Sequence, residues 1–566
     1  MASHEAAAPI TRLPAELLAE ILRECESPRD FLNLALACKS LLRQAEAALH
    51  RHRVAHRRFR YVSDLDPSCF PDLVRSVVLC QDDFVAIYAR SIDIWVPRLS
   101  WDEWRQCEVD ERGMRMQGEV LDGVKFNEHE IKQLLALTRD WVGEEELSAA
   151  HEELENGADG LLKFLVIASC PRLEMLKFIR RNDVLHKSSQ MWLEKSIRHI
   201  LSGGSEWPPG LQSLRDAAFG VDAGILDEHI QIVDVDLRPD KDACLSLRAI
   251  LQLPALKTLH YRTECYLGDP SAEDSQSGLS PASSNVETLY LDNVTGTSHG
   301  FLYELSKAPK KLETLAIRTH HLRGAFDNPD TFLEMLRESQ PQHLKRLMFY
   351  NPSGLSGYRC NAYRPEDIQD LGNLTMWYQN AGDMCLQALY DCEGDSPNRE
   401  EVVKTYEDYI MPRVEVLVMN GRVDQFVDDK AAAWSYFDDA IETTIWRHGG
   451  AGPLKAIFIP APNEGELDLQ AQQDDPSTDL PVTYPRAIEA AEECNVDLYV
   501  FGRGKGTDQT RHRLDFPLLV TKWDIPTGPD YKKRVEQGFV KFNPLSGEWQ
   551  HVSEPGNGLY AETQGI

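Results

Sequence analysis

The chain has 566 residues, enough for roughly two to four domains with a sizeable hydrophobic core. Its formal net charge of −30 disfavours nucleic acid as the main partner, because neutralising phosphates requires a basic surface. No apolar run approaches the roughly 18 residues of a membrane-spanning helix, and the N-terminus lacks the basic and apolar regions of a signal peptide. The twelve cysteines are scattered without a Cys-x-x-Cys motif, which favours reduced thiols in a cytoplasmic or nuclear protein.

The N-terminal stretch, residues 10–42, predicts two or three short amphipathic helices. Pro14 suits the first turn of a helix, where a missing N–H has no partner to lose. Ser27 and Pro28 suit the start of a second helix, as N-cap and first helical residue. A unit of about 40 residues is too small for a sizeable core and has more apolar surface than it can bury. We therefore expect a docking module whose remaining apolar surface is covered by a partner.

Three features of this stretch together resemble an F-box, above all that of fungal F-box proteins. They are the pattern Leu-Pro-x-Glu-Leu-Leu-x-x-Ile-Leu starting at Leu13, a Ser-Pro-x-Asp corner at Ser27, and the pair Cys38 and Lys39 after an apolar helix. The Trp that many F-boxes place a few residues further on is replaced by leucines. The resemblance implies that residues 8–50 bind a Skp-family adaptor and, through it, a cullin–RING ubiquitin ligase. The alternative is a helical hairpin packed on its own chain. The residues expected to carry adaptor binding are Leu13, Pro14, Leu17, Leu18, Ile21, Leu22, Leu34, Cys38 and Leu41.

Residues 51–150 are expected to form a linker helix and the irregular start of the next domain. The basic run at 50–60 has two interpretations: a nucleic-acid or nuclear-import patch, or a connecting helix whose basic face balances acidic neighbours. We favour the connecting helix, because a charge run is usually a solvated face. The apolar, β-branched run at 70–79 predicts the first strand of the new domain. Residues 81–150 predict a mostly helical insertion whose tryptophans belong to a core.

A six-residue frame with apolar residues at its first, fourth and sixth positions recurs along the chain. The copies are 173–178, 256–261, 286–291, 312–317, 344–349, 414–419 and 454–459. Four of them follow a helical pattern closed by a proline, namely Pro171, Pro254, Pro309 and Pro341. Each unit is thus predicted as a helix, a break and a short strand. Such units in series build parallel strands joined by crossover connections, and neighbouring units must stack to bury their faces.

This pattern is similar to a divergent leucine-rich-repeat solenoid, a frequent companion of the F-box. The resemblance implies an α/β fold: an N-terminal helical F-box, then an irregular leucine-rich-repeat-like solenoid with parallel strands at 151–510, and a C-terminal cap or tail at 511–566. The frames are unevenly spaced, so we expect the larger gaps to hide further units, with 211–214 as a candidate. Residues 488–495 and 496–501 predict a last helix and strand. Three polar stretches are expected to be exposed loops: 267–285, 391–401 and 463–481.

No motif predicts catalysis or a metal site. Residues 502–506, Gly-Arg-Gly-Lys-Gly, lack the spacing and the following helix of a phosphate-binding loop, so a solvated turn is favoured. The His-Glu pairs at His129 and His151 lack the second histidine of a zinc-protease motif, and Ser356 is not in a nucleophile elbow. We therefore expect a non-catalytic chain without a cofactor.

If each frame is a strand, its alternate residues face away from the helices along one side of the sheet. The residues expected to bind a substrate on that side are Lys177, His260, Arg262, Tyr290, Arg318, Arg346 and Tyr350. A row rich in Arg and Lys in so acidic a chain predicts an acidic or phosphorylated protein ligand, because arginine forks bind carboxylates and phosphates. The alternative is that these strand positions simply carry soluble side chains.

Together, the two resemblances imply the substrate-recognition subunit of a Skp–cullin–F-box ubiquitin ligase. The F-box would dock the adaptor, the repeats would select an unknown protein substrate, and catalysis would belong to partner enzymes. We expect neither nucleic acid nor a membrane as a partner. The alternative is a non-ligase F-box protein that acts as a scaffold or assembly factor.

Overall fold

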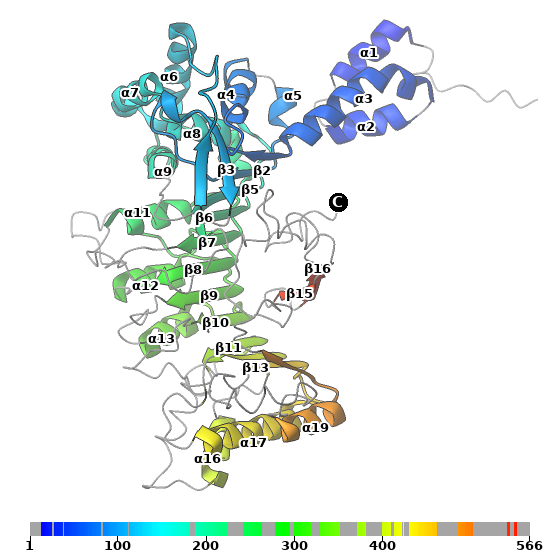
Figure 1. The fold of residues 1–566 in the computed structure, drawn as a ribbon, viewed down its shortest axis with the longest axis vertical. Coiled ribbons are helices and arrows are strands. Elements are labelled where there is room, and N and C mark those ends of the chain that lie inside the picture. The colour runs from blue at the N-terminus through cyan, green and yellow to red at the C-terminus, as the bar shows by residue number, and fades with distance from the viewer. Residues whose placement is uncertain are drawn as a thin grey trace, which may run out of the picture.

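The computed structural model shows an α/β protein in two parts, three N-terminal helices and a long parallel sheet with helices along one side (Figure 1). The structure describes residues 13–24, 28–37, 39–80, 83–110, 113–180, 187–222, 241–262, 278–294, 299–319, 329–350, 371–380, 399–408, 413–420, 423, 430–460, 484–501, 540–543 and 548–551.

The main sheet has twelve strands, and their spatial order follows the order of the chain. The strands are β1 (Tyr61–Ser63), β2 (Ser91–Ile94), β5 (Met175–Arg180), β6 (Asp216–Asp222), β7 (Thr258–Arg262), β8 (Thr288–Val294), β9 (Thr314–Thr319), β10 (Arg346–Tyr350), β11 (Met376–Asn380), β12 (Val416–Asn420), β13 (Ala456–Pro460) and β14 (Asp497–Phe501). Every neighbouring pair is parallel, and equivalent residues of successive units form rows across the sheet.

The predicted series of helix–strand units is confirmed, because all seven six-residue frames form strands of this sheet. The gaps between frames also hide further units, as expected: β6 follows residues 211–214, and β11 lies in the largest remaining gap. The last predicted helix and strand are α19 (Pro485–Cys494) and β14. Prolines close the helices as predicted, since α8 ends at Ser169 and α12 at Lys307, each two residues before a proline.

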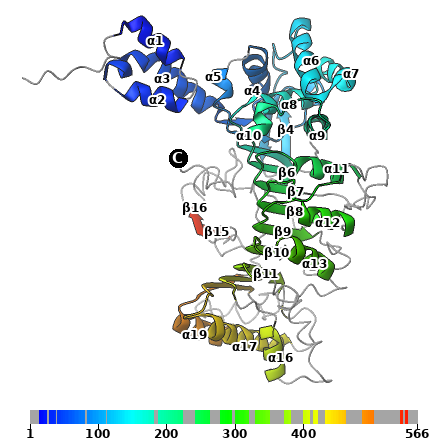
Figure 2. The same ribbon diagram turned by 180° about the vertical axis from the view of Figure 1, so that it is seen from behind.

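Helices connect the strands and cover one side of the sheet, as α11, α12 and α13 show in both views (Figures 1 and 2). The helices of this part are α4 (Cys69–Leu73), α5 (Asp83–Ala86), α6 (Glu128–Val142), α7 (Leu147–Asn156), α8 (Gly160–Ser169), α9 (Lys187–Leu201), α10 (Pro209–Ser213), α11 (Lys241–Ile250), α12 (His299–Lys307), α13 (Pro329–Ser339), α16 (Arg399–Asp408), α17 (Lys430–His448) and α19.

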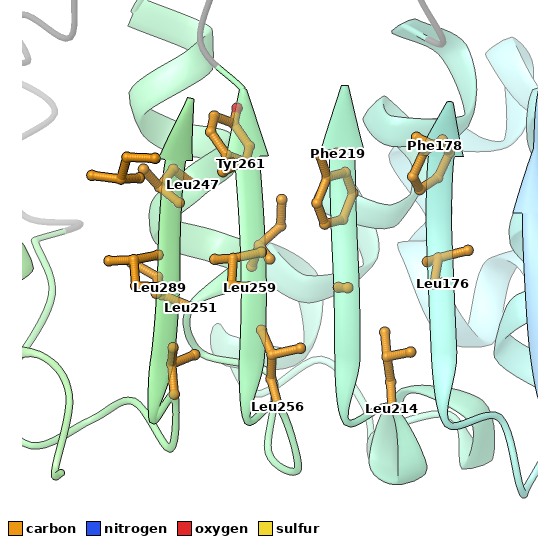
Figure 3. Packing of buried hydrophobic residues seen from close by; sticks show 14 of the residues in the cluster. Leu176, Phe178, Leu214, Phe219, Leu247, Leu251, Leu256, Leu259, Tyr261 and Leu289 are labelled. Atoms are coloured by element: carbon orange, nitrogen blue, oxygen red, sulfur yellow. The ribbon is translucent and has the colours of Figure 1, made fainter. Parts of the chain in front are cut away.

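Leucine side chains that point from the strands toward the helices form one continuous core (Figure 3). Leu259, Leu289 and Leu315 occupy one register row and are fully buried or nearly so. Burying one such side chain contributes roughly 1.5–3 kcal/mol, so the repeated row supplies the stacking energy that a single unit lacks.

Amide side chains, buried in Gln340 and half-buried in Asn285, link successive turns. Gln340 accepts a hydrogen bond from the Leu312 N–H at 3.1 Å, and its amide group donates to the carbonyl of Pro309 at 2.8 Å. Asn285 donates to the carbonyl of Pro254 at 2.7 Å in the same manner. These bonds satisfy backbone groups in the turns, which would otherwise be buried without partners.

The start of the sheet differs from the prediction for residues 70–79. This run is helical: α4 continues into a π-helical segment, Val74–Leu79, that packs on α8. A short apolar run does not distinguish a strand from a buried helix, and here burial of Phe70 and Val74 decides for the helix. The first strands are β1 and β2, so the sheet begins inside the region expected to be a linker.

The region 81–150 is less helical than expected. It contains β2 and an antiparallel hairpin, β3 (Gln106–Asp110) and β4 (Gly113–Gln117), in addition to α6 and α7. Its tryptophans are largely core residues, as predicted, since Trp95 and Trp104 are buried.

The three N-terminal helices are α1 (Ala15–Arg23), α2 (Pro28–Leu36) and α3 (Lys39–Phe59). They share a small core of their own, formed by Leu22, Phe31, Ala35, Ala45 and Leu49. We call residues 13–50 the N-terminal module and residues 61–501 the repeat domain.

Helix α3 joins the two parts without a break (Figure 1). Ala45 belongs to the core of the module, whereas Phe59, fourteen residues later, belongs to the core of the repeat domain. Between them His52 stacks on Phe31 with ring centroids 4.4 Å apart and hydrogen-bonds to the hydroxyl of Tyr88. Residues 39–59 thus form a helix where a connecting helix was expected, and both of its ends are packed in a core.

A fully buried ion network fastens the first turns of the repeat domain. Lys163 Nζ lies 2.8 Å from Asp64 Oδ2 and 2.7 Å from Asp159 Oδ2. The guanidinium of Arg98 lies 3.6 Å from Asp159 and donates to the backbone carbonyl of Asp64 at 2.9 Å. Burial alone would raise the pKa of Asp64, but the charges of Lys163 and Arg98 outweigh it and lower this pKa. Two carboxylates and two cations thus balance each other in the protein interior.

Residues beyond β14 are described only at β15 (Val540–Asn543) and β16 (Glu548–His551), which form a separate antiparallel sheet. The rest of 502–566 lies outside the described residues, so the C-terminal cap stays a prediction. Much of the three polar stretches, 267–277, 391–398 and 463–481, also lies outside the described residues.

Candidate interaction surfaces

An apolar stripe runs along the outer side of helix α1. Leu13, Leu17 and Ile21 are spaced four residues apart, so they lie on one side of the helix and its entry. Their exposed fractions are 36%, 51% and 36%. Pro14, at the start of the helix, is exposed beside them. These four residues are among those predicted to bind an adaptor.

Three more leucines extend the exposed apolar surface to the other helices of the module. They are Leu32 and Leu36 of α2 and Leu42 near the start of α3. Of these, Leu36 and Leu42 lie on either side of the turn between α2 and α3. Scattered exposed leucines are ordinary, but six exposed apolar side chains on a unit of this size are typical of an interaction site. We call Leu13, Leu17, Ile21, Leu32, Leu36 and Leu42 the apolar face.

Other residues predicted to bind the adaptor belong to the interior of the module. Leu18, Leu22 and Leu41 are buried, so the structure assigns them to the interior of the module and not to its exposed surface. Leu18 and Leu22 lie about 100° around α1 from the exposed Leu17 and Ile21, and Leu41 lies about 100° around α3 from the exposed Leu42. Leu34 is half-buried against the module core, and the side chain of Cys38 lies outside the described residues.

The second candidate surface is the side of the main sheet that faces away from the helices, which we call the strand face. At its N-terminal end it is covered: Cys107 of β3 packs with Met175, Ile179, Ala218 and Val221 in a small second core. The hairpin that provides this cover was missed from the sequence.

Lys177, His260 and Tyr290 lie on the strand face, on β5, β7 and β8, as their register predicts. The expectation that they are open to solvent is wrong, because all three are buried. Parallel strands in register place equivalent side chains about 5 Å apart, so they pack against one another. The rings of His260 and Tyr290, for example, have centroids 6.4 Å apart.

Asp292 of β8 is the centre of a charged group on this face. Its Oδ2 lies 3.8 Å from His260 Nε2 and 3.7 Å from Arg262 Nη1, and its side chain is buried. The predicted row of cations is therefore partly neutralised from within the sheet. Gly220, in β6, makes room for this group: it has a φ of +76° and a side-chain carbon there would lie 2.9 Å from Arg262 Cβ.

The remaining predicted substrate contacts lie further along the sheet. Arg346 begins β10 and is half-buried. Arg318 of β9 and Tyr350 of β10 are register partners, and their side chains lie outside the described residues. The sheet thus brings Arg318 and Tyr350 together, while Lys177 lies four strands away from β9.

The carboxyl of Asp216, on the strand face of β6, predicts a pH dependence of stability. Burial raises its pKa to about 6, although the hydroxyl of Thr258 counteracts the shift. Because the folded-state pKa lies above the unfolded one, stability is highest below pH 4 with respect to this group and is lost as the pH rises through about 6. Between pH 4 and pH 7 the carboxyl is expected to lower the free energy of unfolding by up to about 3 kcal/mol, and Asp216→Asn should abolish this decrease. The measurement is urea unfolding of both proteins at the two pH values. Equal pH dependence in both proteins would contradict the prediction.

Among the described residues, no group of three or more His, Cys, Asp or Glu side chains is placed to hold a metal ion. None of the helices in the described part of the chain is both long and apolar enough to cross a membrane. No family model matches the chain, and no match is found among curated proteins.

Proposed function

We propose that this chain is the substrate-recognition subunit of a Skp–cullin–F-box ubiquitin ligase, acting in the cytoplasm or nucleus. The N-terminal module would be the F-box and the repeat domain a divergent leucine-rich-repeat solenoid. The observation that carries the proposal is the apolar face, whose six side chains are exposed on a small module in the part of the chain that the structure describes. A face of this kind requires a partner, and the motif around Pro14 and Cys38 resembles the F-box that binds a Skp-family adaptor.

The connection between the two parts supports a receptor that acts by proximity. Helix α3 has 21 residues and is therefore about 30 Å long. Because its ends are packed in two different cores, a partner bound to the module is held at a fixed distance from the repeat domain. A ligase of this type accelerates transfer by holding a substrate lysine near the charged carrier enzyme, and a rigid connection serves that purpose.

The substrate would be an acidic or phosphorylated protein that contacts the strand face. Arg346 is partly accessible there at the start of β10, and Arg318, near the end of β9, is the register partner of Tyr350. Arginine forks bind carboxylates and phosphates in a bidentate manner, which gives such a surface its specificity. The charged group around Asp292 would then set the polarity of the surface next to these arginines.

The double substitution Leu17→Asp with Ile21→Asp tests the docking claim. Placing two carboxylates in an apolar interface is expected to weaken binding of a purified Skp-family adaptor about a hundredfold or more, measured by calorimetry. The repeat domain should keep its melting temperature, because both side chains are exposed. The matched control is Leu99→Asp with Leu201→Asp, two exposed leucines of the repeat domain, which should leave adaptor binding unchanged. Tight binding by the first variant, or none by the unaltered chain, would refute the proposal.

The second candidate is a scaffold that binds the adaptor without promoting ubiquitin transfer. The two functions differ in a reconstituted reaction with cullin, RING protein and carrier enzyme. A receptor should direct ubiquitin to a protein captured by the strand face, whereas a scaffold should bind the adaptor and leave transfer at its background rate.

A further inference from the structure

Helix α3 is basic in a chain that is otherwise strongly acidic. Residues 39–60 contain seven Lys and Arg residues and one acid, Glu46, although the whole chain has a net charge of −30. Most of these basic side chains are exposed. A concentration of positive charge on one helix creates a local field of opposite sign to the rest of the surface.

Two arginines on one side of the helix, and a third one residue beyond its end, form a stripe. Arg53, Arg57 and Arg60 are four and three residues apart, and Leu42 lies at the same helical phase closer to the N-terminus. Arg53 and Arg57 are exposed, and Arg60 is half-buried. We call Arg53, Arg57 and Arg60 the basic stripe. Leu42, one of the six residues of the apolar face, thus lies in line with the basic stripe.

Acidic neighbours balance only a part of this charge. Arg58, on another side of the helix, pairs with Asp72 at 2.8 Å. Within the described residues Arg53 and Arg57 have no carboxylate within 4 Å. The expectation that the fold itself neutralises the basic face is therefore wrong for these two residues. Their charge is available to a partner.

We propose that the basic stripe is the second half of the docking surface and contacts an acidic segment of the same adaptor protein that covers the apolar face. This inference rests on the proposed function. Leu42 and Arg53 are eleven residues apart, about 16 Å along the helix. A standard interface of about 800 Å² per partner is roughly 30 Å across, so an interface with one edge at Leu42 extends along the helix to the end of the stripe, about 27 Å away.

An acidic protein surface fits the stripe better than nucleic acid does. From Arg53 to Arg60 the stripe is about 10 Å long, which covers few phosphates. The acidic remainder of the chain would repel the continuing polyanion, whereas a protein with a localised acidic segment avoids that repulsion. Charges at the edge of an apolar interface mainly raise the association rate.

The test compares association kinetics of a purified Skp-family adaptor with the full chain and with Arg53→Glu/Arg57→Glu. At about 50 mM salt the variant should associate at least about tenfold more slowly, and at about 500 mM salt the difference should largely vanish because exposed charges are then screened. The matched control is Lys132→Glu/Lys404→Glu, which makes the same change of charge at exposed positions on α6 and α16. The control should associate like the unaltered chain at both salt concentrations.

Three results would overturn the inference: equal rates for the stripe variant and the unaltered chain at low salt, an equal slowing in the control, or a slowing that persists at high salt. The inference would also be overturned if Arg53→Glu/Arg57→Glu lost binding to a DNA duplex but kept its binding to the adaptor. Failure of the proposed function is distinct, because then the unaltered chain does not bind the adaptor at all. If Leu17→Asp/Ile21→Asp abolishes binding while the stripe variant binds normally, only the present inference fails.

Discussion

Replacing Lys163 by methionine is expected to lower the free energy of unfolding by about 3–5 kcal/mol, since it leaves buried charge uncompensated. The ammonium group lies within 2.8 Å of both Asp64 and Asp159, and all three side chains are almost completely buried. Methionine fills a similar volume, so the loss reports charge and not a cavity. Arg98 alone cannot neutralise two carboxylates. The measurement is the midpoint and slope of urea unfolding at pH 7.

A second substitution separates electrostatics from packing. In Lys163→Met/Asp159→Asn one charge of each sign is gone, so Arg98 and Asp64 remain as a balanced pair, and most of the lost stability should return. The single variant should also gain stability toward acidic pH. Burial already raises the pKa of Asp159, and a raised folded-state pKa gives stability that is present at low pH and lost as the pH rises. A double variant no more stable than the single one would contradict this explanation.

The strands of the repeat domain could be predicted because two independent signals coincide. Apolar alternation alone is ambiguous over six residues, but a proline that closes the preceding helix fixes where the strand must begin. Residues 312–317, after Pro309, accordingly become β9. The first two strands escape this reasoning because β1 and β2 have three and four residues and follow no such break.

The apolar run at 70–79 shows the opposite failure. Its valines favour a strand by propensity, yet the segment is helical because Phe70, Leu73 and Val74 bury themselves against α8. Tertiary packing outweighs β-propensity, which is itself mostly a measure of packing context. The hairpin β3–β4 was missed for a related reason, since its role is to cover the strand face, a surface that a local pattern does not reveal.

For the candidate surfaces, sequence periodicity identifies the apolar residues, but it does not tell which of them face the core and which face solvent. Leu17 and Leu18 are equally apolar, and only the position of α3 decides that Leu18 is core and Leu17 is exposed. On the strand face the sequence predicts the alternation correctly. It does not predict that Asp292 lies between His260 and Arg262, because their proximity depends on the register of β7 and β8.

Breaking helix α3 between its two packed ends is expected to uncouple the module from the repeat domain. Val54 is 48% exposed, so Val54→Pro disturbs neither core directly. Proline removes a helical hydrogen bond and clashes with the preceding turn, which costs about 3 kcal/mol and kinks the helix. Labels introduced at Asp30 and Glu152 through a non-natural amino acid should then give a broad distance distribution in place of a narrow one. Val54→Ala keeps the helix and should keep the narrow distribution.

The functional consequence follows from the role of the helix in positioning. The apolar face and its supporting core lie before residue 50, so Val54→Pro should still capture the adaptor. If the chain is the ligase subunit proposed above, ubiquitin transfer to a bound substrate should fall about tenfold or more, because misplacing a reacting group by a few ångströms forfeits the advantage of proximity. Transfer at the unaltered rate despite a broad distance distribution would show that the rigidity of α3 does not matter for function. Loss of adaptor capture would show instead that the module depends on the repeat domain for its fold. The distance distribution and the transfer rate together decide whether helix α3 positions a bound substrate for ubiquitin transfer after the adaptor has bound.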